Sequence, residues 1–184
     1  MIIKKILYKF TNKEKYNEYK KDLSIKKKIK ILKSGFEDEI IKIQDIIKNQ
    51  NEISFLNSGH LGDVINALPT IKELSKTHTC NFYLQTNKPL PTHIRGYKHS
   101  KDLVYMNDRM VDMLLPLLKC QSYINKVEKY NNNKIDIDLD LFRRMPMNFN
   151  LDEVRWYFHL TGVHTDLSKP YLFVEPSNVI KNKV

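Results

Sequence analysis

The sequence predicts an α/β domain with a parallel β-sheet, preceded by a basic helical extension. Residues 1–50 combine apolar residues at helical spacing with an excess of lysine. Residues 51–176 alternate between short apolar runs and longer amphipathic segments, as strands followed by helices do. This alternation predicts parallel strands joined by right-handed crossovers. Residues 177–184 are mostly polar and are predicted to form a tail or linker.

The composition excludes several classes of protein. Hydrophobic residues make up 41% of the 184 residues, enough for a packed core, so we do not expect global disorder. No apolar run reaches the roughly 18–20 residues that span a bilayer. Lysines interrupt Met1–Phe10, which does not resemble a signal peptide. Cys80 and Cys120 are too few for a disulfide framework or a cysteine zinc site, so a reducing cytoplasm fits best.

Most of the positive charge belongs to the extension. The whole chain has a formal net charge of +10, and residues 1–50 contribute +7 from 14 Lys and 7 acidic residues. A basic arm of this kind can bind nucleic acid or anionic lipid. Because it contains no arginine for bidentate phosphate contacts, we interpret its lysines as a solvated surface. We do not expect a nucleic-acid partner, and peripheral membrane contact stays an open alternative.

The extension is predicted to form two helices. Apolar residues recur at three- and four-residue spacing through residues 2–23, and Ser34-Gly35 interrupts the pattern. Three acidic residues at 37–39 then open a second helix, where their charge suits the positive helix end. The apolar face of this helix has to pack on the main domain or on another chain. Its members are Ile40, Ile41, Ile43, Ile46 and Ile47.

The main domain is predicted to contain six short strands and three helices in alternation. The strands are expected at 53–57, 81–85, 103–106, after 123–127, at 135–142 and at 171–174. The helices are expected at 63–74, 109–119 and 151–161. Segment 135–142 has the clearest alternation of apolar and polar residues, and Gly162 is a suitable C-cap for the last helix.

The turn Ser58-Gly-His-Leu-Gly-Asp63 is the most informative segment. Ligands of open α/β sheets bind beyond the carboxyl ends of strands and beside helix N-termini. Gly59 and Gly62 are expected to let a ligand approach the backbone or to adopt a positive φ, and His60 lies beside Asp63. Asp63 is either the helix N-cap or a general base that faces the cleft, and the spacing alone favours the cap. The turn has neither the dinucleotide-binding glycine pattern nor the Lys-Ser/Thr of a P-loop.

A second candidate site follows in the predicted strand 135–142. Asp136, Asp138 and Asp140 occur at a spacing of two, which places them on one face of a strand. Three such carboxylates suggest a divalent cation site, although we favour a hydrated sheet edge. Arg143 and Arg144 follow this strand near its carboxyl end and could hold a phosphate, although a solvated pair is the commoner outcome.

The segment Phe55–Leu74 resembles the opening of heptosyltransferase-type (family 9) glycosyltransferases. In that family a strand is followed by a turn ending in L-G-D-V-I, then by A-L-P and an amphipathic helix. The residues that match are Leu61, Gly62, Asp63, Val64, Ile65, Leu68 and Pro69. The resemblance implies a Rossmann-like acceptor-side domain, the N-terminal half of a GT-B fold. It also implies a C-terminal domain or partner chain that binds the nucleotide-sugar.

The function implied by the resemblance is inverting sugar transfer to a glycan or glycolipid hydroxyl, as in lipopolysaccharide and glycan biosynthesis. It implies that Asp63 is the general base, and that no metal or cofactor is needed besides the nucleotide-sugar donor. Gly59, His60, Gly62 and Arg143 are then expected to bind the acceptor. The implied location is the cytoplasm or the inner face of the membrane.

A non-catalytic binding module is the alternative from a different class. In that case the basic helices of residues 1–50 would dock an anionic surface or a partner protein. Such a module would bind in a strongly salt-dependent way and would be indifferent to Asp63→Asn.

Overall fold

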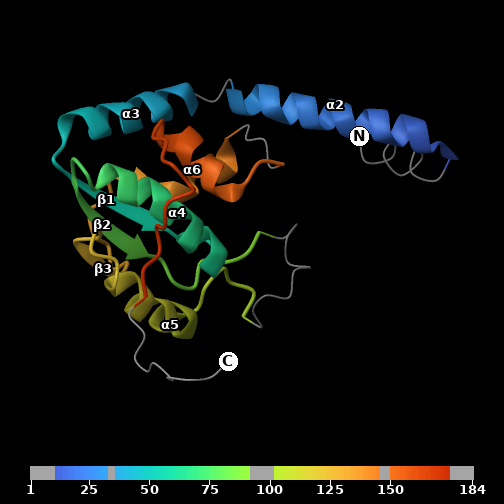
Figure 1. The fold of residues 1–184 in the computed structure, drawn as a ribbon. Helices are drawn as coiled ribbons and strands as arrows, with labels where there is room; N and C mark the ends of the chain where they lie inside the picture. The colour runs from blue at the N-terminus through green and yellow to red at the C-terminus, as the bar shows by residue number, and fades with distance from the viewer. Residues whose placement is uncertain (1–10, 33–35, 92–101, 146–149, 175–184) are drawn as a thin grey trace.

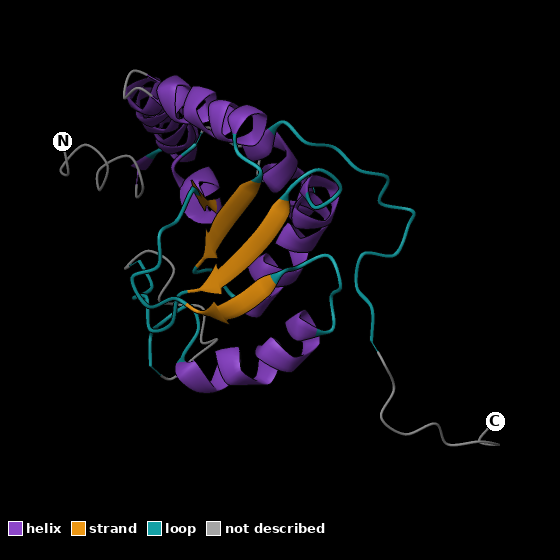
Figure 2. Cartoon of the chain, turned by 90° about the vertical axis from the view of Figure 1, so that its left-hand side faces the viewer, coloured by secondary structure: helices purple, strands orange, loops and turns teal. Residues whose placement is uncertain are grey.

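The chain has a Rossmann-like α/β fold with four parallel strands (Figures 1 and 2). The computed structural model describes residues 11–32, 36–91, 102–145 and 150–174. The strands are β1 (Glu52–Asn57), β2 (Thr79–Leu84), β3 (Lys126–Lys129) and β4 (Ile137–Asp138). The helices are α2 (Lys13–Leu32), α3 (Phe36–Asn49), α4 (Leu61–Leu74), α5 (Asp108–Lys119), the 3-10 helix η1 (Leu139–Arg144) and α6 (Glu153–Thr161). The predicted fold class is confirmed.

The strand order changes direction between β1 and β4. The sheet runs β3-β2-β1-β4, so the chain first builds outward from β1 to β2 and β3 and then returns to the other side of β1. β1 pairs with β2 from Glu52↔Thr79 to Asn57↔Leu84, and it pairs with β4 at Phe55↔Ile137 and Leu56↔Asp138. The loops that follow β1 and β4 therefore leave the same edge of the sheet side by side.

One face of the sheet forms the core with α4. In β1, Ile53 and Phe55 are fully buried while Ser54 between them is more exposed, as the two-residue period of a strand requires. In α4, Val64 and Leu68 are fully buried and follow the four-residue spacing of a helix. Each such side chain stabilises the fold by about 1.5–3 kcal/mol.

The isoleucine face of α3 packs on the main domain, which settles the two alternatives left by the sequence. Ile43 is buried in the core, and Ile40, Ile46 and Ile47 pack partly buried against it. Ile41 is 58% exposed and does not belong to this face, contrary to the prediction. Figure 1 shows that α3 lies next to α6 and that α2 continues away from the domain. None of the described helices is long and apolar enough to cross a membrane.

One predicted strand is shortened and another is absent because side-chain hydrogen bonds replace strand pairing. Segment 135–142 forms a strand only at Ile137–Asp138 and then turns into η1, because Asp138 Oδ1 accepts a hydrogen bond from the Asp140 amide at 2.9 Å. Segment 171–174 is irregular. The amide group of Gln121 pairs with both backbone groups of Phe173, at 2.8 and 2.9 Å, and takes the place of a neighbouring strand.

Segment 103–106 is not a strand either, since Val104 forms only an isolated antiparallel bridge with Pro89. The other described strands and helices agree with the prediction, and α6 ends at Gly162 with a φ of 70°. The predictions for residues 2–10, for Ser34-Gly35 and for 177–184 fall outside the described residues.

The packing of α3 gives a matched pair of variants. We expect Ile43→Ala to lower the free energy of unfolding by about 2–4 kcal/mol, because it removes a buried side chain and leaves a cavity. Ile41→Ala changes an exposed residue two positions earlier in the same helix, so its effect should stay within about 0.5 kcal/mol. Urea denaturation of both variants measures the difference. Equal effects would contradict the packing of α3 on the core.

Candidate active site

The candidate active site lies where the strand order changes direction. Open α/β sheets bind ligands in the crevice beyond the carboxyl ends of their strands at this switch point. Here the loop after β1 leads into α4, and the chain after β4 turns at once into η1. Arg143 of η1 reaches across to α4, and its Nη2 lies 2.5 Å from Asp63 Oδ2. The structure thus joins two residues that are 80 positions apart in the sequence.

Asp63 is the third residue of α4, and His60 is the N-cap. The N-cap interpretation is therefore wrong, although Asp63 Oδ2 does accept a hydrogen bond from the His60 amide at 2.5 Å. Burial by itself would raise the pKa of Asp63. The effects of Glu153, the Arg143 charge and the His60 amide outweigh burial, so the pKa of Asp63 lies below its ordinary value. Asp63 is therefore ionised at neutral pH.

Gly59 is required because the Asp63 side chain and the Arg143 guanidinium pass directly over it. A Cβ at this position would lie 2.5 Å from Asp63 Cβ and 2.6 Å from Arg143 Nη2, too close for either pair of atoms. A Cβ at Gly62 would meet no atom within 4 Å. Among the described glycines only Gly162 has a positive φ, so the expectation of a positive φ at 59 or 62 is wrong. Gly59 allows a close approach, and the approaching groups belong to the protein itself.

Arg143 is held in place from several sides. Its Nε lies 3.3 Å from Asp140 Oδ1, and its guanidinium carbon lies 4.6 Å and 4.9 Å from the ring centroids of Phe142 and Tyr105. These contacts combine ion pairing with cation–π attraction. The side chain keeps 27% of its surface exposed, so these contacts do not enclose it completely.

Asp140 connects this ion pair to a second cation. It is buried, it accepts a hydrogen bond from the Ser58 amide at 2.9 Å, and its Oδ2 also contacts the Ser58 hydroxyl. Lys88, from the loop after β2, places its Nζ 3.2 Å from the same oxygen. The charges of the two aspartates, Asp63 and Asp140, are therefore balanced by those of Arg143 and Lys88. This balance offsets the cost of burying the two carboxylates.

Neither the alternative of a metal site nor the favoured hydrated sheet edge describes these aspartates, because the strand ends at Asp138 and the side chains of Asp136 and Asp140 are buried. Asp136 Oδ2 accepts a hydrogen bond from the Ser54 amide at 2.9 Å, Asp138 holds the first turn of η1, and Asp140 joins the ion pairs. The three carboxylates thus point to different partners. No group of three potential ligands is close enough to hold a metal ion anywhere in the described ranges.

His60 is directed at Tyr105. Its Nδ1 lies 3.0 Å from the Tyr105 carbonyl oxygen, and the two ring centroids are 5.0 Å apart. Because a carbonyl oxygen only accepts, Nδ1 carries a proton in this arrangement. Of the residues predicted for the site, four come together, namely Gly59, His60, Asp63 and Arg143. Gly62 is not part of this cluster, since a Cβ there would meet no atom within 4 Å.

Sequence reasoning missed the contribution of α6. Glu153 lies in its first turn, where Oε2 accepts a hydrogen bond from Asn66 Nδ2 at 2.8 Å. Burial, the hydrogen bond to Asp63 and the negative charge of Asp63 raise the pKa of Glu153 to about 7. One turn later, the Tyr157 hydroxyl donates to the Asp63 carbonyl oxygen at 2.9 Å. No spacing in the sequence relates these residues to the turn at 58–63.

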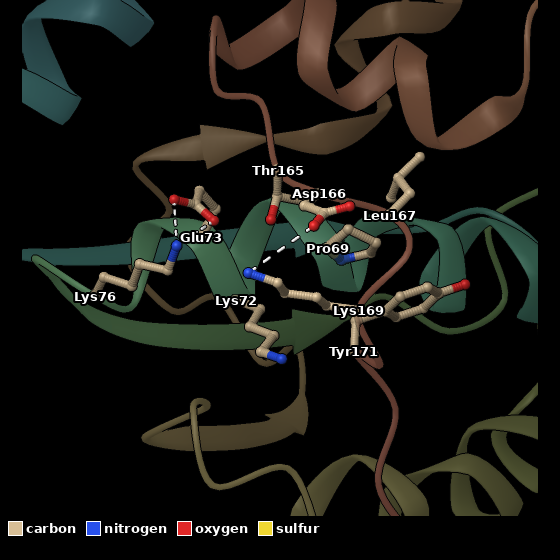
Figure 3. Close-up of a pocket in the computed structure, with 9 residues that line it drawn as sticks. All are labelled: Pro69, Lys72, Glu73, Lys76, Thr165, Asp166, Leu167, Lys169 and Tyr171. Atoms are coloured by element: carbon tan, nitrogen blue, oxygen red, sulfur yellow. Dashed lines mark hydrogen bonds and ion pairs between the residues drawn. The ribbon is translucent and has the colours of Figure 1, made fainter.

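A separate pocket lies over the other end of α4 (Figure 3). It is lined by Pro69, Lys72, Glu73, Lys76 and the segment 165–171. Its lysines are already engaged, since Lys76 Nζ lies 2.6 Å from Glu73 Oε1 and Lys72 Nζ donates to the Pro170 carbonyl oxygen at 2.6 Å. This pocket shares no lining residue with the site at the switch point.

Comparisons with protein-family models, with curated proteins and with solved structures found no match for this chain.

The close approach at Gly59 predicts an asymmetry between the two glycines of the turn. We expect Gly59→Ala to destabilise the fold by about 1–3 kcal/mol, because the added methyl group overlaps Asp63 and Arg143. Gly62→Ala adds the same group in open space within a helix and should be neutral or stabilise by up to about 1 kcal/mol. Urea denaturation at neutral pH compares the two. A Gly59→Ala variant as stable as Gly62→Ala would refute the close contact.

Proposed function

We propose that this chain is the acceptor-side domain of an inverting GT-B glycosyltransferase. The supporting observation is the position of Asp63, an ionised carboxylate in the first turn of α4 at the point where the strand order changes direction. The residues around it are those that resemble the heptosyltransferase-type family. The reaction is transfer of a sugar from a nucleotide-sugar to a hydroxyl of a glycan or glycolipid.

Asp63 acts as the general base in this proposal. It removes the proton from the acceptor hydroxyl while the hydroxyl oxygen attacks the anomeric carbon of the donor. The bond from that carbon to the phosphate oxygen breaks on the opposite side, so the configuration at the carbon inverts. The positive end of α4 and the Arg143 guanidinium keep Asp63 ionised, which is the state that can accept a proton.

Arg143 is the residue best placed to orient the acceptor. A guanidinium has five N–H groups, and the contacts to Asp63 and Asp140 use those on Nη2 and Nε. The side chain is 27% exposed, and in this proposal its remaining N–H groups bind acceptor oxygens. The nucleotide-sugar itself would be held by a C-terminal domain or a partner chain.

The decisive variant is Asp63→Asn, assayed as release of nucleoside diphosphate from a nucleotide-sugar panel with the donor-binding domain and glycolipid acceptors supplied. We expect the rate to fall roughly 10²–10⁴-fold, because an amide cannot accept the proton. Asp166→Asn is the matched control, since that carboxylate is exposed and lies on the separate pocket. Thermal unfolding establishes that both variants fold. Full activity of a folded Asp63→Asn variant would overturn the proposal.

Helix α2 favours a second candidate function, docking of an anionic surface. Its described lysines are exposed, and the helix extends away from the domain (Figure 1). Surface lysines near an anionic membrane contribute about 1 kcal/mol each, and salt screens this attraction. The described lysines of α2 are Lys13, Lys15, Lys20, Lys21, Lys26 and Lys27.

A docking role predicts binding to vesicles of equal parts phosphatidylglycerol and phosphatidylcholine at low salt. Replacing four lysines of α2 by Gln should abolish that binding, and so should raising the salt to roughly 1 M. The control replaces four lysines of the main domain and changes the net charge equally. Co-sedimentation measures both, and equal loss in the two variants would contradict a role of α2. The α2 set is Lys20, Lys21, Lys26 and Lys27, and the control set is Lys72, Lys76, Lys119 and Lys126.

A further inference from the structure

Glu153 faces Asp63 across the contact between α6 and α4. One of its oxygens, Oε2, accepts a hydrogen bond from Asn66 Nδ2 at 2.8 Å. The other, Oε1, is buried and receives no hydrogen bond from an N–H or O–H group of the described residues. Glu153 and Tyr157 lie one turn apart in α6, and they contact Asn66 and the Asp63 carbonyl oxygen of α4, respectively. This packing places the carboxyl groups of Glu153 and Asp63 on facing turns, where each shifts the pKa of the other.

Two ionised carboxylates on these facing turns would repel each other, and neither could donate a hydrogen bond to the other. A buried carboxylate oxygen without a donor is also costly. Both problems disappear when the two groups share one proton, so that together they hold one proton and one negative charge.

The surroundings place the proton on Glu153. Asp63 lies 2.5 Å from both Arg143 Nη2 and the His60 amide, so its charged form is strongly favoured. Glu153 receives only the neutral amide of Asn66, and the charge of Arg143 affects it less than burial and Asp63 do. Two tyrosines also face the pair. Tyr157 donates its hydroxyl proton to the Asp63 carbonyl oxygen, and burial together with the charges of Asp140 and Asp63 raises the pKa of Tyr105.

We propose that Asp63 and Glu153 work as one proton-sharing pair, and that Glu153 is the positioning residue through which the pair serves as the base of the transfer. This inference rests on the proposed function and deepens it. The sequence pattern points to Asp63 alone, whereas the structure supplies the second carboxyl group.

The pair explains how a buried aspartate with a lowered pKa can still be a competent base. While the pair holds its shared proton, it could accept only a second proton, which would have to bind Asp63, whose pKa is low. Once the shared proton is lost, the pair can take up a proton again with an apparent pKa of about 7, which belongs to the pair as a whole. The acceptor hydroxyl then gives its proton to the pair, its oxygen bonds to the anomeric carbon, and the phosphate leaves with the electron pair of its bond. The proton finally passes to water.

The first test needs no substrate. We expect carboxyl-carbon NMR of the full chain to show Glu153 titrating near pH 7, with a simultaneous shift of the Asp63 carboxyl carbon. In Glu153→Gln, which keeps a donor to Asp63 and an acceptor for Asn66, the Asp63 shift near pH 7 should disappear. Separate titrations of the two groups at ordinary acidic pH would overturn the inference.

The pH dependence of stability provides a second test of the same pair. The raised pKa of Glu153 adds stability that is fully present below its ordinary value of 4.5 and is lost as the pH rises through about 7. The denaturation midpoint of the wild type should therefore fall over this window relative to Glu153→Gln. Glu73→Gln is the control, because the pKa of that partly exposed group is lowered and it titrates below the window.

The transfer assay separates this inference from the proposed function. The wild-type rate should rise roughly tenfold per pH unit up to about pH 7, as expected for a single ionisation, and Glu153→Gln should be slower at pH 8 and insensitive to pH in this range. A shared titration without any transfer would support the pair and overturn the proposed function. Transfer with separate titrations would support the function and overturn the pair.

Discussion

The ion pair between Arg143 and Asp63 is the contact on which the arrangement of the site depends. Both side chains are largely removed from water, so each needs the other to offset the loss of hydration. The pair also ties η1 to the first turn of α4 across the point where the strand order changes direction. Gly59 lacks a side chain where the two groups pass, and Asp140 and Lys88 extend the pair into a balanced set of charges.

The helical packing around this pair connects the N-terminal extension to the site. The Gln44 side chain of α3 donates to the Thr161 carbonyl oxygen at the end of α6, at 2.7 Å. At the other end of α6, Glu153 faces Asp63, and Tyr157 donates to its carbonyl oxygen. Helix α6 is therefore fixed by α3 on one side and contributes two residues to the site on the other. The extension supports the geometry of the site through α6, whether or not α2 has a docking role of its own.

The local signals in the sequence predicted the fold class and most of the elements. Periodicity located α3 to α6 and the first two strands, because burial of one face imposes a fixed spacing on both kinds of element. Alternation failed where side-chain hydrogen bonds, one local and one between distant segments, decided the backbone conformation. The Asp138 side chain turned a predicted long strand into η1, and the amide of Gln121 took the place of a strand partner for Phe173. Neither of these side-chain contacts alters the pattern of apolar residues along the sequence.

The sequence by itself determined an α/β fold with a parallel sheet, the turn at 58–63 as the candidate site, and Asp63 as its central carboxylate. Periodicity and turn residues act over a few positions, so they can be read along the chain. Only the tertiary structure decided what Asp63 contacts. Arg143 and Glu153 reach it from elements 80 and 90 residues away, and burial gives their charges an effect on Asp63 that no spacing encodes. The pKa of Asp63 is thus a property of the packed molecule.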